Sequence, residues 1–264
     1  MSEGLEGGSP VLLEQRGAVA VLTLNDPGHY NALDGSMLAL LNDAMDRALD
    51  DPGVRAVLLT GAGRGFCAGA RLDGGVFESG AAVETLLAQV NRLIERMRGT
   101  ALPIVVAVNG PAAGAGVGLA LAGDVVIAAR SARFVLSFAR LGAALDAGTS
   151  FFVQQAVGAA RTRALALLGH SLPAEVAAQW GLIWEAVDDD ALLARTYALA
   201  DQLAAGPSVG LGLIKRQLQT AAIGNLSAAL AGEADAQVRA FATEDLREGA
   251  RAFVEKRAAR FAGR

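Results

Sequence analysis

The stretch Pro103–Asp124, PIVVAVNGPAAGAGVGLALAGD, is the most informative part of this chain. It begins with five small or β-branched apolar residues after a proline, which predicts a short buried strand. Asn109-Gly110-Pro111 then predicts a turn. Glycine and alanine dominate the next residues, so this segment cannot pack a core by itself. Either its bare backbone approaches a ligand at the start of a helix, or its small residues pack a helix tightly against a neighbour.

A second glycine-rich loop has the same design. Thr60–Ala70, TGAGRGFCAGA, ends a strand-like run that begins at Val54. Two such loops can aim two backbone N–H groups at one oxygen atom, which is the geometry of an oxyanion hole. Other glycine motifs fit less well. The loop lacks the third glycine of a dinucleotide fingerprint, and neither a Gly-Lys-Ser/Thr phosphate loop nor a Gly-x-Ser-x-Gly elbow occurs.

Composition excludes several classes of protein. The chain has 264 residues, of which 53% are hydrophobic, and a net charge of −4 with acids and bases mixed. That charge pattern argues against nucleic-acid binding. Every apolar run is interrupted before the roughly 18–20 residues of a membrane span, so no membrane association is expected. The polar N-terminus does not resemble a secretory signal, and the single cysteine, Cys67, fits a reducing cytosol. We therefore expect a cytoplasmic protein.

The order of predicted elements indicates an α/β fold. Residues 1–9 read as a disordered tail, and residues 10–205 alternate strands with helices. Two of these helices are predicted at 149–157 and 162–168, and a further short helix is predicted with Ser171 as its cap. Residues 206–264 have a helical pattern only, which places a boundary near Gly206-Pro207. Helices are predicted at 191–205, 208–222, 226–243 and 246–258.

Four motifs together resemble the crotonase (enoyl-CoA hydratase/isomerase) superfamily. They occur in the family's order and extend from about residue 10 to the end of the chain. They are Asn25-Asp26-Pro27 with Asn31-Ala32-Leu33, GAGRGFCAGARL at 61–72, VNGPAAGAGVGLALAGD at 108–124, and REGARAFVEKR at 247–257. The set is specific for the superfamily and much less specific for the reaction, because this scaffold supports many reactions.

The resemblance implies a fold, a substrate and an assembly. The fold would be a β/α superhelix of repeated strand–strand–helix turns with a C-terminal helical region for trimerisation. The substrate would be an acyl-CoA thioester. No separate cofactor is implied, because coenzyme A is part of the substrate. The protein would be a homotrimer or a hexamer built as a dimer of trimers.

The resemblance also assigns roles to the two glycine-rich loops. Ala70 and Ala115 would donate the two N–H groups that hold the thioester oxygen. The backbone around Cys67 and Ala68 would meet the adenine of coenzyme A. These positions follow from matching the family's motifs residue by residue.

Three further residues have implied roles in binding coenzyme A. Lys256, with Phe253, would reach a coenzyme A bound to a neighbouring subunit. Arg71 stands where the family often has aspartate. Its side chain would either contact the phosphates of coenzyme A or be a solvated surface residue, and the sequence leaves both open.

The residues expected for hydration are missing. A hydratase of this superfamily holds water between two glutamates, whose places are taken here by Gly118 and Phe138. Neither side chain can exchange a proton, so hydration is disfavoured, and Phe138 becomes a residue that lines the substrate site. In several isomerases of the superfamily a single aspartate carries out the proton transfers, and Asp146 matches its position.

Asp146 therefore has two competing interpretations. It is flanked by small and apolar residues, which should raise its pKa toward neutrality and make it a suitable acid/base group. Alternatively, it caps a helix that begins near Thr149. The first interpretation predicts a catalytic residue, and the second predicts a structural one.

A finer resemblance concerns the 1,2-epoxyphenylacetyl-CoA isomerase group of phenylacetate degradation. Residues 177–184 (AAQWGLIW), Val187-Asp188-Asp189 and Leu213-Ile214-Lys215 carry it, although Ala144-Leu145 stands where that group usually has a proline. The resemblance favours an isomerase that shifts a double bond or isomerises an epoxide ring in an acyl-CoA. One alternative is a hydratase or hydrolase of the same superfamily. Another is a catalytically inactive assembly protein that binds CoA thioesters. An enzyme of this kind would act in fatty acid or phenylacetate degradation.

Overall fold

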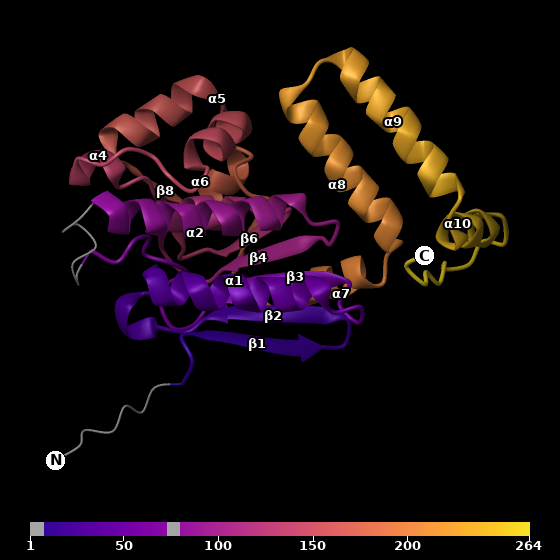
Figure 1. Cartoon of the computed structure of the whole chain (residues 1–264), viewed down its shortest axis with the longest axis horizontal. Helices are drawn as coiled ribbons and strands as arrows, with labels where there is room; N and C mark the ends of the chain where they lie inside the picture. Colours follow the sequence, from indigo (N-terminus) through magenta and orange to yellow (C-terminus); the bar gives the residue numbers. More distant parts are fainter. Residues whose placement is uncertain (1–7, 73–79) are drawn as a thin grey trace.

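The protein is built around a six-stranded sheet (Figure 1). The computed structural model describes residues 8–72 and 80–264. The first two strands form an antiparallel hairpin, and each later strand pairs in parallel with its neighbour. The strands in spatial order are β1 (Val11–Arg16), β2 (Val19–Leu24), β3 (Ala56–Gly61), β4 (Ile104–Val108), β6 (Val125–Ala129) and β9 (Glu185–Val187).

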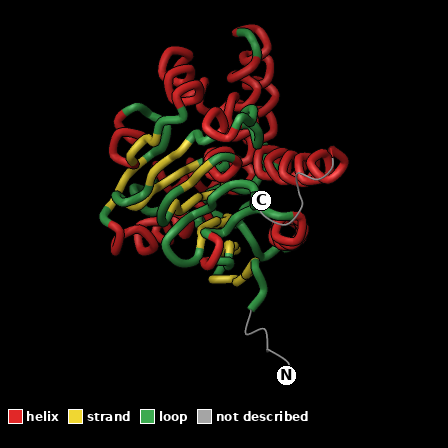
Figure 2. The backbone as a smooth tube through the Cα atoms, turned by 90° about the vertical axis from the view of Figure 1, so that its left-hand side faces the viewer, coloured by secondary structure: helices red, strands yellow, loops and turns green. Residues whose placement is uncertain are grey.

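Helices cover both faces of this sheet (Figure 2). α1 (Gly35–Asp50) packs against β1, β2 and α2 (Gly80–Gly99), whereas α7 (Leu192–Ala204) packs against β3, β4 and β6. β4 is buried at all five positions, because a parallel strand between two helical layers has no solvent face. This burial explains the unbroken apolar run after Pro103.

α1 shows how the sequence specifies these helices. The side chain of Asp34 accepts a hydrogen bond from the backbone N–H of Met37, which satisfies one free donor of the first turn. Met37, Leu41 and Met45 recur at a helical period and are buried against the sheet. The cap contributes about 1 kcal/mol, and the apolar face contributes more.

A smaller sheet lies beside the main one and leads into the candidate site. It consists of β5 (Ala112–Ala113), β7 (Arg133–Val135) and β8 (Ser171–Pro173). Four helices lie between these strands or directly after the last one in the chain, and α3 packs on α5. They are α3 (Ala115–Leu121), α4 (Phe138–Leu141), α5 (Thr149–Leu168) and α6 (Ala174–Gln179).

The last three helices extend away from the sheet as an arm (Figure 1). They are α8 (Ser208–Ile223), α9 (Leu226–Phe241) and α10 (Glu244–Val254). α8 and α9 pack against each other, and α10 contacts α9. Two single 3₁₀ turns, Pro27–His29 and Asp189–Ala191, complete the elements.

The predicted α/β architecture with a helical C-terminal region is confirmed. One local prediction was wrong, because Ser171 does not cap a helix. It is the first residue of β8 and pairs with Val135 of β7, and α6 begins only at Ala174. The two helices predicted at 149–157 and 162–168 are joined as α5, with a kink at Gly158 (φ 78°). Most of the predicted tail, residues 1–7, lies outside the described residues.

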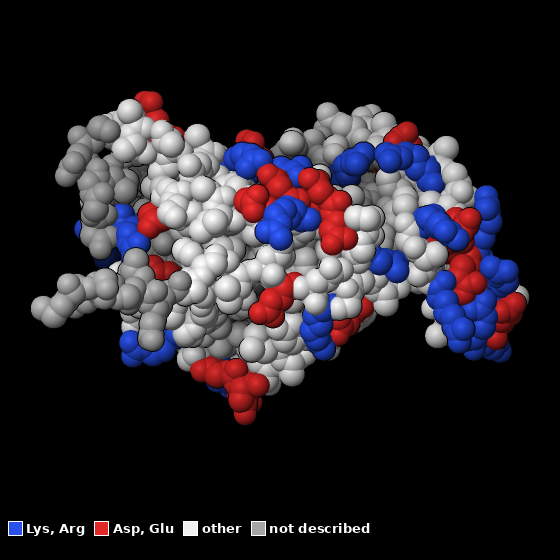
Figure 3. Space-filling view, turned by 60° about the horizontal axis from the view of Figure 1, so that its bottom comes forward, with Lys and Arg blue, Asp and Glu red and all other residues white. Residues whose placement is uncertain are grey.

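The surface agrees with the mixed charge of the sequence. On the face in Figure 3, acidic and basic side chains are interspersed and form no continuous basic patch. In the parts of the chain that the structure describes, no helix combines the length and the apolar composition needed to cross a membrane.

Candidate active site

The first glycine-rich loop presents a free backbone donor at Ala70. Leu33 donates to the Gly69 carbonyl at 2.7 Å and accepts from the Arg71 N–H at 2.9 Å. In this parallel pairing the N–H of the intervening residue, Ala70, points away from Leu33. Within the described residues no acceptor takes this N–H.

The second loop presents another free donor at Ala115, the first residue of α3. The N–H groups of a first helical turn have no partner inside the helix, and no other acceptor for this one occurs in the described segments. The two loops touch: a Cβ on Gly69 would lie 2.7 Å from the Ala113 oxygen and 3.2 Å from the Ala115 nitrogen. Only glycine fits there, so both donors belong to one compact structure.

Ala70 and Ala115 line the same pocket, which has a volume of about 340 Å³. Most of its walls are apolar and come from α2, α4 and the segment before α5. The lining residues are Ala68, Ala70, Leu72, Val83, Leu86, Leu87, Gly114, Ala115, Ser137, Phe138, Leu141, Ala143, Ala144, Leu145 and Asp146. Concave apolar pockets with a few polar groups are the usual form of small-molecule sites.

Asp146 is the one ionisable side chain among these lining residues. Its Oδ1 is buried and has no hydrogen-bond partner among the described residues. Burial raises the pKa of Asp146 to about 6, although a hydrogen bond from its own backbone N–H opposes the shift. A buried carboxyl group without a partner costs folding free energy, and such groups concentrate at functional sites.

The structure contradicts the alternative that Asp146 caps a helix. The N-cap of α5 is Gly148, and no side chain caps this helix. Only the backbone of Asp146 takes part, since its carbonyl accepts from the Thr149 N–H at 2.9 Å. The carboxyl group is therefore free for chemistry in the pocket.

The two positions that would hold glutamates in a hydratase differ in location. Phe138, at the start of α4, is buried and lines the pocket, whereas Gly118, in the middle of α3, does not. Neither position carries an ionisable side chain, so Asp146 is the one such group among the described lining residues.

Arg71 is held by two carboxylates rather than left free for a ligand. Its guanidinium lies 2.7 Å from Asp34 and 3.2 Å from Asp26, and its side chain is 23% exposed. Burial pushes the pKa of Asp34 upward, but the Met37 N–H and Arg71 together hold it below its usual value. A contact of Arg71 with the phosphates of coenzyme A stays a prediction, and these ion pairs do not favour it.

Cys67 and Ala68 play different parts in the first loop. Ala68 lines the pocket, whereas Cys67 is fully buried outside it. Burial raises the pKa of the Cys67 thiol to about 12, so the thiol stays protonated. The carbonyl of Cys67 accepts from the Ala113 N–H at 2.9 Å, which ties the two loops together.

Phe253 and Lys256 do not reach this pocket within one chain. α10, which contains Phe253 and ends just before Lys256, lies at the opposite end of the molecule from α4 (Figure 1). Phe253 is 86% exposed, and Lys256 is exposed in a left-handed conformation (φ 54°). Their predicted contact with coenzyme A therefore requires a second copy of the chain.

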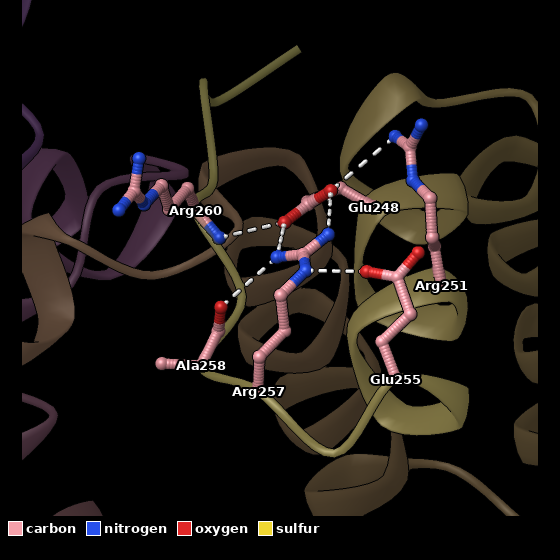
Figure 4. A pocket seen from close by; sticks show the side chains of 6 residues that line it. All are labelled: Glu248, Arg251, Glu255, Arg257, Ala258 and Arg260. Atoms are coloured by element: carbon pink, nitrogen blue, oxygen red, sulfur yellow. Dashed lines mark hydrogen bonds and ion pairs between the residues drawn. The ribbon is translucent and has the colours of Figure 1, made fainter.

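A larger hollow of about 720 Å³ lies beside this C-terminal segment (Figure 4). Arg257 is at its centre and pairs with Glu248 and Glu255, each at 2.6 Å. The Arg257 hydrogen bond, with help from the Arg260 N–H, lowers the pKa of Glu248 to about 2. These paired charges lie where the chain folds back after α10, at the opposite end of the molecule from α4 (Figure 1).

Sequence reasoning missed Ser137 as a lining residue. It stands directly before Phe138, which was identified, but a serine at a helix start usually reads as a cap. Here it makes no side-chain cap bond, and its place in the pocket wall depends on the fold of the smaller sheet.

Comparison with known proteins defines the class of this protein. The family model for enoyl-CoA hydratase/isomerase matches residues 14–264. The chain is 43% identical over 253 residues to 1,2-epoxyphenylacetyl-CoA isomerase of Escherichia coli, covering 93% of this chain and 95% of the relative. It is also 43% identical over 247 residues to a probable enoyl-CoA hydratase of Rhodobacter capsulatus, with the same coverage.

A solved structure agrees with this assignment. An enoyl-CoA hydratase from Polaromonas sp. JS666 superposes with a TM-score of 0.91 at 31% identity, covering 95% of this chain and 99% of the other. The chain belongs to the enoyl-CoA hydratase/isomerase family, with the crotonase fold that its sequence motifs predicted.

Proposed function

We propose that this protein is an acyl-CoA isomerase in which Asp146 carries out both proton transfers. The observation that carries the proposal is the position of Asp146, whose Oδ1 is buried and has no partner among the described residues, in the pocket lined by Ala70 and Ala115. An isomerase needs one acid/base group and a means of stabilising an enolate, and the pocket contains both.

The proposed reaction moves a double bond without net gain or loss of atoms. The Asp146 carboxylate takes a proton from the carbon next to the thioester carbonyl of a 3-enoyl-CoA. The electron pair moves onto the thioester oxygen, which accepts hydrogen bonds from the Ala70 and Ala115 N–H groups. The carbonyl then re-forms, a 2,3 double bond appears, and Asp146 returns the proton to carbon 4. The proton never leaves the site.

The apolar walls support an uncharged acyl group. No lysine or arginine lines the described pocket, so no cation is available there for a second carboxylate on the acyl chain. Coenzyme A would enter as part of the substrate, with no separate cofactor. Epoxide ring isomerisation, the activity in the name of the Escherichia coli relative, uses the same polarised thioester.

Hydration is the second candidate, because a relative of equal identity is named as a probable enoyl-CoA hydratase. Hydration needs a water molecule held by acid/base groups. Among its described lining residues this pocket offers Asp146 alone. Gly118 and Phe138 occupy the other two positions. A protein that only binds acyl-CoA is the third candidate, which the raised pKa of Asp146 does not favour.

We further propose that the C-terminal helices assemble the protein into trimers or hexamers. Phe253 and Val254 are 86% and 80% exposed at the end of the arm. Large apolar side chains so exposed are typical of a surface that a partner covers. A neighbouring copy would bring Lys256 to the coenzyme A bound in this chain.

The test uses two substrates and the absorbance of the conjugated thioester. We expect 3-enoyl-CoA to gain this absorbance as the double bond moves into conjugation. We expect 2-enoyl-CoA to retain this absorbance, except for a small loss as part of it returns to the 3-enoyl form. Hydration would instead consume 2-enoyl-CoA and yield a hydroxyacyl-CoA, identifiable by mass. Binding of both thioesters with no change in either would support the inactive binding protein.

A further inference from the structure

The turn that carries Asp146 rests directly on α3 at Gly118. A Cβ built on Gly118 would lie 2.8 Å from the Ala147 Cβ and 2.9 Å from the Ala147 carbonyl carbon, and closer still to the carbonyl oxygen. Most of these atoms are backbone, which cannot rotate aside as a flexible side chain does. Gly118 thus provides the space that the backbone of Ala147 fills.

The turn has little freedom to move elsewhere. Ala147 is buried and adopts a left-handed conformation (φ 49°), and Gly148 follows with φ 72°. A non-glycine residue in this conformation persists only where its surroundings hold it. The Thr149 N–H, 2.9 Å from the Asp146 carbonyl, closes the turn on its other side. Displacing Ala147 would therefore move Asp146 as well.

We infer that Gly118 is a positioning residue, whose missing side chain lets the Ala147 turn pack on α3 and so holds the Asp146 carboxyl group in the pocket. This inference rests on the proposed function of Asp146. It also gives position 118 a role in choosing the reaction. The side chain of a glutamate at position 118 would need the space that the Ala147 turn now fills. On this backbone, a glutamate at 118 is therefore incompatible with the present position of Asp146.

The test is Gly118→Ala, assayed on 3-enoyl-CoA across pH. We expect kcat to fall about 10²-fold, the loss that a misplacement of about 1 Å can cause. KM should change less than about threefold, because a Cβ at position 118 would meet Ala147 and position 118 does not line the pocket. The acid limb of the pH profile should shift to lower pH, because a displaced carboxyl group regains water. A merely structural role would leave that limb in place.

A matched control is Gly232→Ala in α9. Gly232 is also inside a helix, but a Cβ there meets nothing within 4 Å. This variant should keep the kcat, KM and pH profile of the parent protein.

A second variant covers the case in which Gly118→Ala fails to fold. Ala147→Ser adds a single oxygen atom at the same contact from the side of the turn, without β-branched carbon atoms in a left-handed conformation, and we expect kcat and the acid limb to change in the same direction. If either folded variant keeps the parent's kcat and pH profile, the inference is wrong. A parent protein that does not isomerise 3-enoyl-CoA would instead contradict the proposed function.

Discussion

Asp146 combines two costs that folding alone does not explain. Its Oδ1 is buried without a partner, and burial raises its pKa to about 6. The neighbouring Thr149 hydroxyl oxygen is also buried and unpartnered among the described residues. A protein selected only for stability would pair or remove such groups. Retaining them at the wall of an apolar pocket agrees with a group that must change its protonation state during a reaction.

The raised pKa predicts a pH dependence of activity. The proposed first step needs the carboxylate form of Asp146, and this form is lost as pH falls through about 6. We therefore expect kcat/KM for 3-enoyl-CoA to be constant above about pH 7 and to fall roughly tenfold per pH unit well below 6. Steady-state rates from pH 4.5 to 8.5 would check this. A limb near pH 4 would mean that Asp146 is solvated.

Single residues could be predicted from the sequence where a motif fixes them. Ala70, Ala115 and Asp146 lie in recognisable loops, and all three line one pocket. The contact between Gly118 and Ala147 could not be predicted, because it joins residues from separate elements. Sequence marks a missing glutamate at 118 but does not reveal what fills its place.

Short elements hold the donors of this site. α3 has seven residues, all of them buried, and its first N–H is the proposed donor of Ala115. The small residues of this stretch therefore agree both with a backbone that approaches a ligand and with a helix packed tightly against its neighbours. They present a free N–H, and they let α3 pack tightly against the first loop and α5.

Proline at position 115 tests this donor without disturbing the helix. Proline is well accepted at the first position of a helix, because that N–H has no partner within it. Ala115→Pro should therefore fold, while losing one oxyanion donor and about 10²–10³-fold in kcat. The readout is kcat on 3-enoyl-CoA together with the far-UV circular dichroism spectrum.

The control for this change is Leu226→Pro, at the first position of α9. Leu226 is 75% exposed, and its helix is capped by Asn225. This variant should retain the parent's kcat. If Ala115→Pro did the same, the Ala115 N–H would not be an oxyanion donor.

Helices and strands followed the sequence pattern where burial has a clear period. α1 and α2 carry apolar residues at helical spacing, and this pattern marks both helices in the sequence. Ser171 departs from its prediction because pairing with β7, which is remote in sequence, outweighs the local preference for a cap.

At the scale of the molecule, Lys215 anchors the helical arm to the sheet domain. Its Nζ lies 2.8 Å from Asp124 and donates to the carbonyls of Met97 and Leu102. Burial lowers the pKa of Lys215, while Asp124 opposes this shift. The ammonium group therefore joins α8 to the end of α2 and to the loop before β6.

Removing this anchor should destabilise the protein. Lys215→Met removes the ammonium partner of Asp124 and of two carbonyls, while Asp124 keeps the Ile104 N–H at 2.8 Å and Arg98 at 3.9 Å. Because only Lys215 is buried, we expect a loss between the ~1 kcal/mol of an exposed pair and the ~3 kcal/mol of a fully buried one. Denaturation in urea would measure the loss. Arg216→Met, which changes an exposed neighbour, should have almost no effect. Equal midpoints for the two variants would contradict the anchoring role.

The arm also leads to a prediction about assembly. If Lys256 binds the coenzyme A of a neighbouring copy, Lys256→Ala should raise KM for acyl-CoA severalfold and leave kcat nearly unchanged. The mass of the protein in solution should then be that of three chains or a multiple of three. Light scattering and steady-state kinetics would check both. A monomer with full activity would rule out a contact between subunits. The α/β core and helical arm were predictable from patterning, whereas the contacts by which Lys215 joins them were not, because they connect residues remote in sequence.

The central claim is that one carboxyl group, Asp146, moves the proton. The most direct test is Asp146→Asn, which keeps the shape of the side chain and removes its ability to accept a proton. We predict that kcat for conversion of 3-enoyl-CoA to 2-enoyl-CoA falls by at least about 10³-fold, within the range for general acid–base groups. Binding of the thioester should persist, because Ala70 and Ala115 remain. Full isomerase activity in Asp146→Asn would contradict the account.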